Sequence, residues 1–126
     1  MNKNSFNKLA GTLIMGYTHV SSLTGNENDG SDMFQKDPKD KSLYFFSPME
    51  EVTDAMTLAQ KMSEAHEVAI YLDGGEVTVH TISKNKSIPS YNEVVSSSLP
   101  FSITLSCLKA SGIDVASLLK ELGYQS

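Results

Sequence analysis

The stretch that most constrains the fold is Phe101–Cys107, a β-branched and mostly apolar run that ends on the only cysteine of the chain. A short run of this composition, with Pro100 before it, is typical of a buried β-strand. Cys107 would then lie at the carboxyl end of that strand, where open α/β sheets hold their ligand crevices. Composition alone favours the alternative, that Cys107 is a small buried apolar residue, because free cysteines are among the most buried residue types.

Length and charge limit the classes of function. The chain has 126 residues, which suits one domain with one core. Its formal net charge of −5 argues against nucleic acid or an anionic membrane surface as the partner. No stretch approaches the roughly 20 apolar residues of a membrane-spanning helix. The single cysteine excludes an internal disulfide, and the three histidines have no metal-ligand spacing, so we expect no cofactor and no metal.

The amino-terminal part, residues 1–40, differs in composition from the rest. Two lysines precede an apolar patch at residues 9–16, which faintly resembles a signal peptide but has no clear cleavage site. A poorly ordered arm, or a short helix over residues 6–15, are the other interpretations. Residues 24–40 are polar and rich in turn formers, so they predict a linker. We therefore expect the folded domain to cover residues 41–126.

A strand and a helix are predicted next. Residues 42–46 form a compact apolar and aromatic run, which indicates a strand. Ser47-Pro48-Met49-Glu50 has the pattern of a capping box with proline at the first helical position. The helix should end near Ala65 and present one apolar face, formed by Met49, Val52, Ala55, Met56, Ala59 and Met62. The sequence contains no glycine-rich phosphate loop, which disfavours nucleotide binding.

Residues 68–72 predict a second buried strand, and a strand–helix–strand order implies a right-handed parallel βαβ unit. Two interpretations compete after it. Local propensity favours a hairpin at Asp73-Gly74-Gly75 with an antiparallel strand over residues 76–82. Alternatively, the glycines mark a loop at the carboxyl edge of a parallel sheet. Residues 89–98 read as a short helix, and Asp114 is a good N-cap for a final helix that Gly123 would end.

Three further polar side chains, those of His66, Asp73 and His80, are interpreted as turn, structural or solvent-facing residues. His66 is expected to be an exposed turn residue, and His80 to be structural or solvent-facing. Asp73 would approach Cys107 if both residues lay at carboxyl ends of neighbouring strands. A nearby carboxylate raises a thiol pKa, so Asp73 is better interpreted as a turn former than as a catalytic assistant.

The order of these motifs resembles the DsrE/DsrF-like family, which includes the TusD-type sulfur-relay subunits. The resemblance rests on the opening strand, on the first helix with Ala55-Met56 and Ala59, on His66–Gly74, and on Cys107–Ile113. His66–Gly74 is similar to the family pattern G-H-x-V-x-(I/V)-(F/Y)-(L/F)-x-(D/G)-G, and Cys107–Ile113 to C-x-x-A-x-G-(I/L). The match covers roughly residues 42–122.

The resemblance implies a flavodoxin-like, three-layer α/β fold with a small, mainly parallel sheet, and a homo- or hetero-oligomer. It implies that Cys107 is the catalytic residue, carries sulfane sulfur as a persulfide and exchanges it with donor and acceptor proteins. Thr104 replaces the earlier cysteine of the C-x-x-C found in some relatives, which excludes an internal disulfide step. The chain also ends where the family usually adds strands. The sheet is then short at that edge, completed by a partner, or completed by the amino-terminal part.

The leading hypothesis is thus a DsrE-like sulfur-trafficking protein, a carrier or sulfurtransferase subunit that uses Cys107, in the cytoplasm unless the amino-terminal segment directs export. The alternative is a non-catalytic oligomeric interaction module of the same fold, with a Cys107 that resists alkylation. A flavodoxin-like small-ligand binder is a third hypothesis, which the missing phosphate loop disfavours.

Overall fold

The computed structural model describes residues 3–20, 33–37, 39, 42–84 and 91–121. Its elements, in chain order, are α1 (Lys3–Leu9), the π-helix η1 (Ala10–Ile14), β1 (Thr18–His19), β2 (Met33–Gln35), β3 (Tyr44–Phe45), α2 (Val52–Met62), β4 (His66–Asp73), β5 (Glu76–Ser83), β6 (Tyr91–Ser96), α3 (Leu99–Ala110) and α4 (Val115–Glu121). No described helix has the length and apolarity that crossing a membrane requires.

The strands form two antiparallel sheets, so the expected flavodoxin-like, mainly parallel sheet is wrong. β1, β2 and β3 form a small sheet, and β4, β5 and β6 form a longer meander. The turn between β4 and β5 decides the direction of the larger sheet. Gly74 and Gly75 have φ values of +60° and +84°, as in the two-residue turns that join antiparallel strands. The hairpin interpretation of residues 73–82 is therefore confirmed, and the parallel βαβ unit is not present.

The predicted strand over residues 101–107 is a helix, because the sequence before it caps a helix. The Ser98 side chain accepts a hydrogen bond from the Phe101 backbone N–H at 3.3 Å, and Pro100 lies in the first turn. Both are standard helix-start features. The helix, α3, runs from Leu99 to Ala110 and contains Cys107 near its end.

The sequence of α3 resembles that of a buried strand because the helix is buried on nearly every side. It packs against β5, β6 and α2, and it also contacts α1, η1 and α4. Pro100 and every residue from Ser102 to Leu108 are buried. A helix without a polar face lacks the 3.6-residue alternation of apolar and polar side chains by which amphipathic helices are recognised.

α2 begins later than the capping box predicts. Its N-cap is Glu51, and residues 48–50 form a turn in which Ser47 C=O accepts bonds from the N–H groups of Glu50 and Glu51. The Asp54 carboxylate accepts a hydrogen bond from the Ser47 N–H at 2.9 Å, which holds the turn against the helix. Four residues of the expected apolar face are buried, while Val52 and Met56 are exposed and Leu58 is buried instead. The helix ends at Met62 rather than near Ala65.

The remaining predictions have mixed outcomes. The helix predicted over residues 89–98 is wrong, because residues 91–96 form β6, whose alternating side chains suit a sheet with one covered face. Asp114 does cap α4: its carboxylate accepts hydrogen bonds from the Ser117 N–H at 3.1 Å and hydroxyl at 2.7 Å. These bonds lower the pKa of Asp114. Gly123 lies outside the described residues.

The amino-terminal residues pack on the same core as the rest. α1 and η1 confirm the short-helix interpretation of residues 6–15, and Phe6, Ala10 and Phe34 are fully buried. The Asn7 side-chain oxygen accepts a buried hydrogen bond from the Met49 N–H at 2.9 Å. Residues 24–32 of the predicted linker lie outside the described residues.

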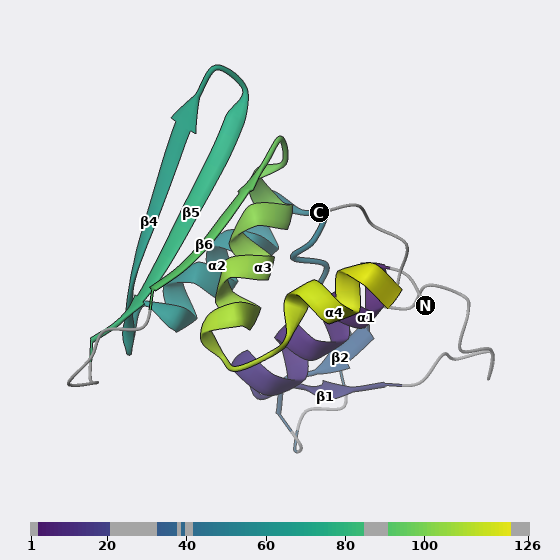
Figure 1. Cartoon of the computed structure of the whole chain (residues 1–126). Helices are drawn as coiled ribbons and strands as arrows, with labels where there is room; N and C mark the ends of the chain where they lie inside the picture. Colours follow the sequence, from purple (N-terminus) through teal and green to yellow (C-terminus); the bar gives the residue numbers. More distant parts are fainter. Residues whose placement is uncertain (1–2, 21–32, 38, 40–41, 85–90, 122–126) are drawn as a thin grey trace.

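The elements are arranged around α3. Figure 1 shows the β4–β5–β6 sheet on one side of α2 and α3, with α1, α4 and the small sheet on the other side. Along β5, Val77, Val79 and Thr81 point toward the helices and are buried. The side chains that alternate with them, Thr78, His80 and Ile82, lie on the opposite face of the sheet. We call this second face the open face.

Candidate functional site

Cys107, the predicted catalytic residue, lies inside the molecule. Its exposed fraction is 0 %, and burial raises the pKa of the thiol to about 12. The thiolate is the reactive form of cysteine, so at neutral pH this thiol is protonated as well as inaccessible. The sheet edge on which the prediction placed Cys107 does not exist, because the residue is in α3. Sulfur transfer by Cys107 stays a prediction that requires α3 to open.

Asp73 and Cys107 are not brought together. Asp73 ends β4 and pairs with Glu76 at the hairpin turn. Ser106, the neighbour of Cys107, lies beside the other end of β5, where its hydroxyl is 2.6 Å from the Thr81 hydroxyl. Asp73 is therefore a turn residue and has no access to the thiol.

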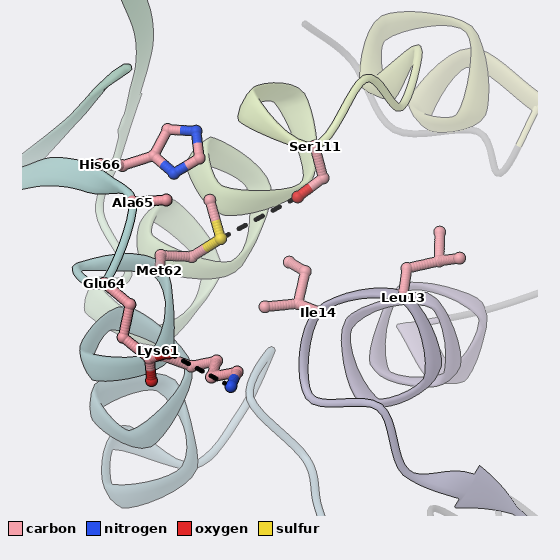
Figure 2. A pocket seen from close by; sticks show the side chains of 8 residues that line it. All are labelled: Leu13, Ile14, Lys61, Met62, Glu64, Ala65, His66 and Ser111. Atoms are coloured by element: carbon pink, nitrogen blue, oxygen red, sulfur yellow. Dashed lines mark hydrogen bonds and ion pairs between the residues drawn. The ribbon is translucent and has the colours of Figure 1, made fainter. Parts of the chain in front are cut away.

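A pocket of about 250 Å³ lies where η1 faces the α2–β4 corner. Figure 2 shows Leu13 and Ile14 on one side, facing Met62, His66 and the charged pair Lys61 and Glu64 on the other, with Ser111 above. The Lys61 ammonium and Glu64 carboxylate are 3.4 Å apart, and both side chains are well exposed. The Ser111 hydroxyl donates to the Cys107 C=O at 2.9 Å. Lys61 and Glu64 are thus paired with each other, and Ser111 is bonded to the main chain of α3.

His66 is the polar residue of this pocket that stands out. It is partly buried rather than an exposed turn residue, since it begins β4. Its Nδ1 atom is buried and has no hydrogen-bond partner. One unpaired imidazole nitrogen can bind a water molecule or a hydroxyl group. Within the described residues no cluster of metal-ligating side chains is present, so His66 has no co-ligand there.

The open face of the β4–β5–β6 sheet carries the most distinctive side-chain group. Tyr71 of β4, His80 of β5 and Tyr91 of β6 form one row across the three strands. The His80 ring centroid is 5.1 Å from that of Tyr71 and 4.8 Å from that of Tyr91. Tyr71 and Tyr91 are 55 % and 54 % exposed. Adjacent strands bring such side chains together when their register aligns them on one face.

A polar cluster fixes one end of this row. Glu93 Oε2 lies 2.9 Å from His80 Nε2 and accepts a hydrogen bond from the Tyr91 hydroxyl at 3.1 Å. The Tyr91 hydroxyl is also 2.8 Å from His80 Nε2. Partial desolvation raises the pKa of Tyr91, and the hydrogen bond to Glu93 raises it further. Three side chains from two strands therefore hold one another in place on the protein surface.

The sheet is acidic as well as aromatic. Its strands contain Glu67, Asp73, Glu76 and Glu93 and no lysine or arginine. No helix of the described chain packs on the open face, because α2 and α3 lie on the other side. Sequence reasoning placed His80 correctly as structural or solvent-facing but missed the row. The alternation of residues 76–82 was the available signal, but β6 had to be recognised before Tyr91 and Glu93 could join it.

Comparisons with known proteins give a fold and no family. No family model matches the sequence, and no curated protein matches it. The structure is similar to the crystal structure of a phage protein from Bacillus cereus ATCC 14579, with a TM-score of 0.58 over 86 % of this chain and 90 % of that chain. The sequence identity is 18 %, so the likeness concerns the fold alone. The DsrE/DsrF resemblance remains untested.

Proposed function

We propose that the protein is a non-catalytic protein-binding domain, whose open sheet face binds a basic segment of a partner protein. The observation that carries this proposal is the exposed row of Tyr71, His80 and Tyr91 on a sheet whose strands bear four carboxylates and no lysine or arginine. The interaction module considered from the sequence is retained here on a different fold.

The row suits binding because its rings are already ordered. The hydrogen bonds of Tyr91 to Glu93 and His80 restrict its ring before any partner arrives. Large side chains that are fixed in advance lose little conformational entropy on binding. Val95, which is 46 % exposed, lies across from Thr78 and extends the apolar surface. The face thus offers both ring surface and aliphatic surface.

The chemistry of the partner follows from charge and from the rings. Exposed tyrosine faces attract ammonium and guanidinium groups by about 0.5–1 kcal/mol each. The carboxylates of Glu67 and Glu93 flank the row from β4 and β6 on the same face. A net charge of −5 adds long-range attraction to a basic partner. A segment that alternates lysine or arginine with apolar residues complements this face.

Two features favour binding over catalysis. The only thiol is buried and protonated, and the charged residues of the pocket are paired with each other.

The probe for the proposal is an eight-residue peptide that alternates lysine and valine. We expect its titration to shift the NMR ring signals of Tyr71 and Tyr91, with an affinity that falls as salt rises. Substituting both tyrosines by serine should weaken binding about five- to thirtyfold, since two ring contacts of about 0.5–1 kcal/mol each are lost. The matched control is Tyr44→Ser, which removes an exposed tyrosine of the small sheet.

The peptide that alternates glutamate and valine serves as the charge control and should not bind. Equal binding of both peptides, or equal weakening by the Tyr44→Ser control, would show that the open face is not the binding surface. Saturable binding lost only in the double-tyrosine variant would support the proposal.

A further inference from the structure

The two edges of the larger sheet differ in whether another strand can pair with them. On β6, the outward-facing Glu93 C=O accepts a hydrogen bond from Lys109 Nζ of α3 at 3.0 Å. Among the described residues, no side chain is bonded in this way to the main chain of β4. Within the described chain it pairs with β5 alone, and Figure 1 shows it as the outer edge of the sheet.

β4 also lacks most of the features that usually protect an edge strand, and its only carboxylates are those of Glu67 and Asp73. Such strands are kept from pairing by lysine, proline, bulges or short length. β4 is eight residues long, pairs with β5 without a bulge from His66 to Asp73, and contains neither lysine nor proline. Leu72 at its end is 69 % exposed, on the opposite face of the strand from Tyr71. An edge with these properties can accept a further strand.

The hairpin turn determines which main-chain groups of β4 are free. Asp73 and Glu76 flank a two-residue turn, so they form a hydrogen-bonded pair. Hydrogen-bonded and non-hydrogen-bonded pairs alternate along an antiparallel strand. The main-chain groups that face β5 are therefore those of Asp73, Tyr71, Ala69 and Glu67. The groups that face outward along the free edge are those of His66, Val68, Ile70 and Leu72.

We propose that β4 pairs antiparallel with β4 of a second copy, about a two-fold axis at Ala69, to form a continuous six-stranded sheet. In this register Val68 lies opposite Ile70 of the second copy, and His66 opposite Leu72 of the second copy. The free groups then form about eight backbone hydrogen bonds. The exposed Leu72 side chain is placed beside the His66 side of the pocket. This inference stands independently of the partner proposed for the open face.

Charge disfavours the register that is shifted toward the hairpin turn. With the axis at Ala69, Glu67 lies opposite Tyr71 of the second copy, and no two carboxylates face each other. A shift that places the axis at Ile70 sets Glu67 opposite Asp73 of the second copy, twice. Like charges directly opposite destabilise a sheet. The small Ala69 side chain also allows close approach at the axis, where a non-hydrogen-bonded pair has its Cα atoms about 4.5 Å apart.

Cross-linking tests the register directly. The Ala69→Cys variant should form a covalent dimer under mild oxidation, since the Cα separation lies within the range of about 4.4–6.8 Å that disulfides span. The matched control is Glu67→Cys on the same strand and face, whose two copies would be about 13 Å apart. The buried Cys107 is common to both variants. Cross-linking of neither variant, or of both at equal rates, would overturn the proposal.

A charge exchange tests it without a covalent bond. Tyr71→Glu, at an exposed site, sets two glutamates opposite each other twice, and should weaken dimerisation at least about tenfold in sedimentation equilibrium. Adding Glu67→Lys should restore the dimer, because each new glutamate then faces a lysine. A wild-type protein that sediments as a monomer, or a double variant that does not recover, would contradict the proposal.

Discussion

The Thr81 hydroxyl of β5 lies 2.6 Å from the Ser106 hydroxyl of α3, in the buried layer between sheet and helix. Ser106 also donates to the Asn92 C=O of β6, so one serine joins the helix to two strands. Buried hydroxyls need such partners because an unpaired buried polar group costs about 1–3 kcal/mol. This pair sets the position of α3 on the sheet.

Removing one or the other of these two hydroxyl groups should lower the free energy of unfolding by different amounts. Thr81→Val should cost about 1 kcal/mol in free energy of unfolding, because Ser106 keeps its bond to Asn92. Ser106→Ala should cost about 1–3 kcal/mol, because it leaves the buried Thr81 hydroxyl without its partner and removes the bond from α3 to Asn92 C=O. Urea unfolding measures both. Thr57→Ala, which removes an exposed hydroxyl, is the control and should change stability by less than about 0.5 kcal/mol. A larger loss for Thr81→Val than for Ser106→Ala would contradict this account.

Gly11 allows η1 to approach the Phe34 ring. A Cβ atom at this position would overlap the Cε1 atom of Phe34 and lie 2.7 Å from its Cζ atom. Because Phe34 is fully buried, Gly11→Ala should lower the free energy of unfolding by about 1–3 kcal/mol. Adding Phe34→Leu should recover part of that loss by making room for the methyl group. If the double variant were less stable than the sum of the single changes, overlap with Phe34 would not be the cause.

The β4–β5 turn requires positive φ rather than space. At Gly75 φ is +84°, and a Cβ atom there would meet no heavy atom within 4 Å. Gly75→Ala should therefore cost about 1–2 kcal/mol, from backbone conformation alone. Gly75→Asn should cost less, since asparagine tolerates this region better. Thermal unfolding of the two variants provides the comparison, and equal losses would argue against the conformational explanation.

Burial of Cys107 makes stability depend on pH in the alkaline range. The folded pKa of about 12 exceeds that of the unfolded thiol, which is about 8.5. Above the unfolded pKa the unfolded state loses its proton first, so stability is full below about pH 8.5 and falls as pH rises toward 12. The slope from this group approaches about 1.4 kcal/mol per pH unit. Because other groups also titrate there, the comparison is with Cys107→Ala, whose alkaline loss should be smaller.

Local signals predicted part of this fold correctly. Residues 68–72 are a strand, the Asp73-Gly74-Gly75 turn is a hairpin, and Asp114 caps a helix. Each of these depends on a few adjacent residues. The mainly parallel sheet that the resemblance implied requires a loop at these glycines, and the structure has the hairpin. A turn that needs two positive φ values is a stronger constraint than the spacing of short motifs.

The centre of the fold was not predictable in the same way. Residues 101–107 contain three β-branched or aromatic residues, and strand propensity is a reasonable guide only where neighbours do not decide. Here six surrounding elements bury α3, and the Ser98 cap precedes the apolar run of residues 101–107. The candidate site was missed for the same reason. Tyr71, His80 and Tyr91 belong to three strands, and only the register of the sheet brings them together.

The rate at which Cys107 is alkylated in the native protein tests most directly whether the chain acts by binding or by thiol chemistry. Iodoacetamide labelling at neutral pH, followed by intact-mass measurement, should be at least about a hundredfold slower than in urea, because labelling requires α3 to open. The exposed cysteine of the Val52→Cys variant, on α2, supplies the accessible reference. The account predicts that this cysteine is labelled and Cys107 is not. Labelling of native Cys107 at the reference rate would contradict the account and restore sulfur carriage as the leading hypothesis.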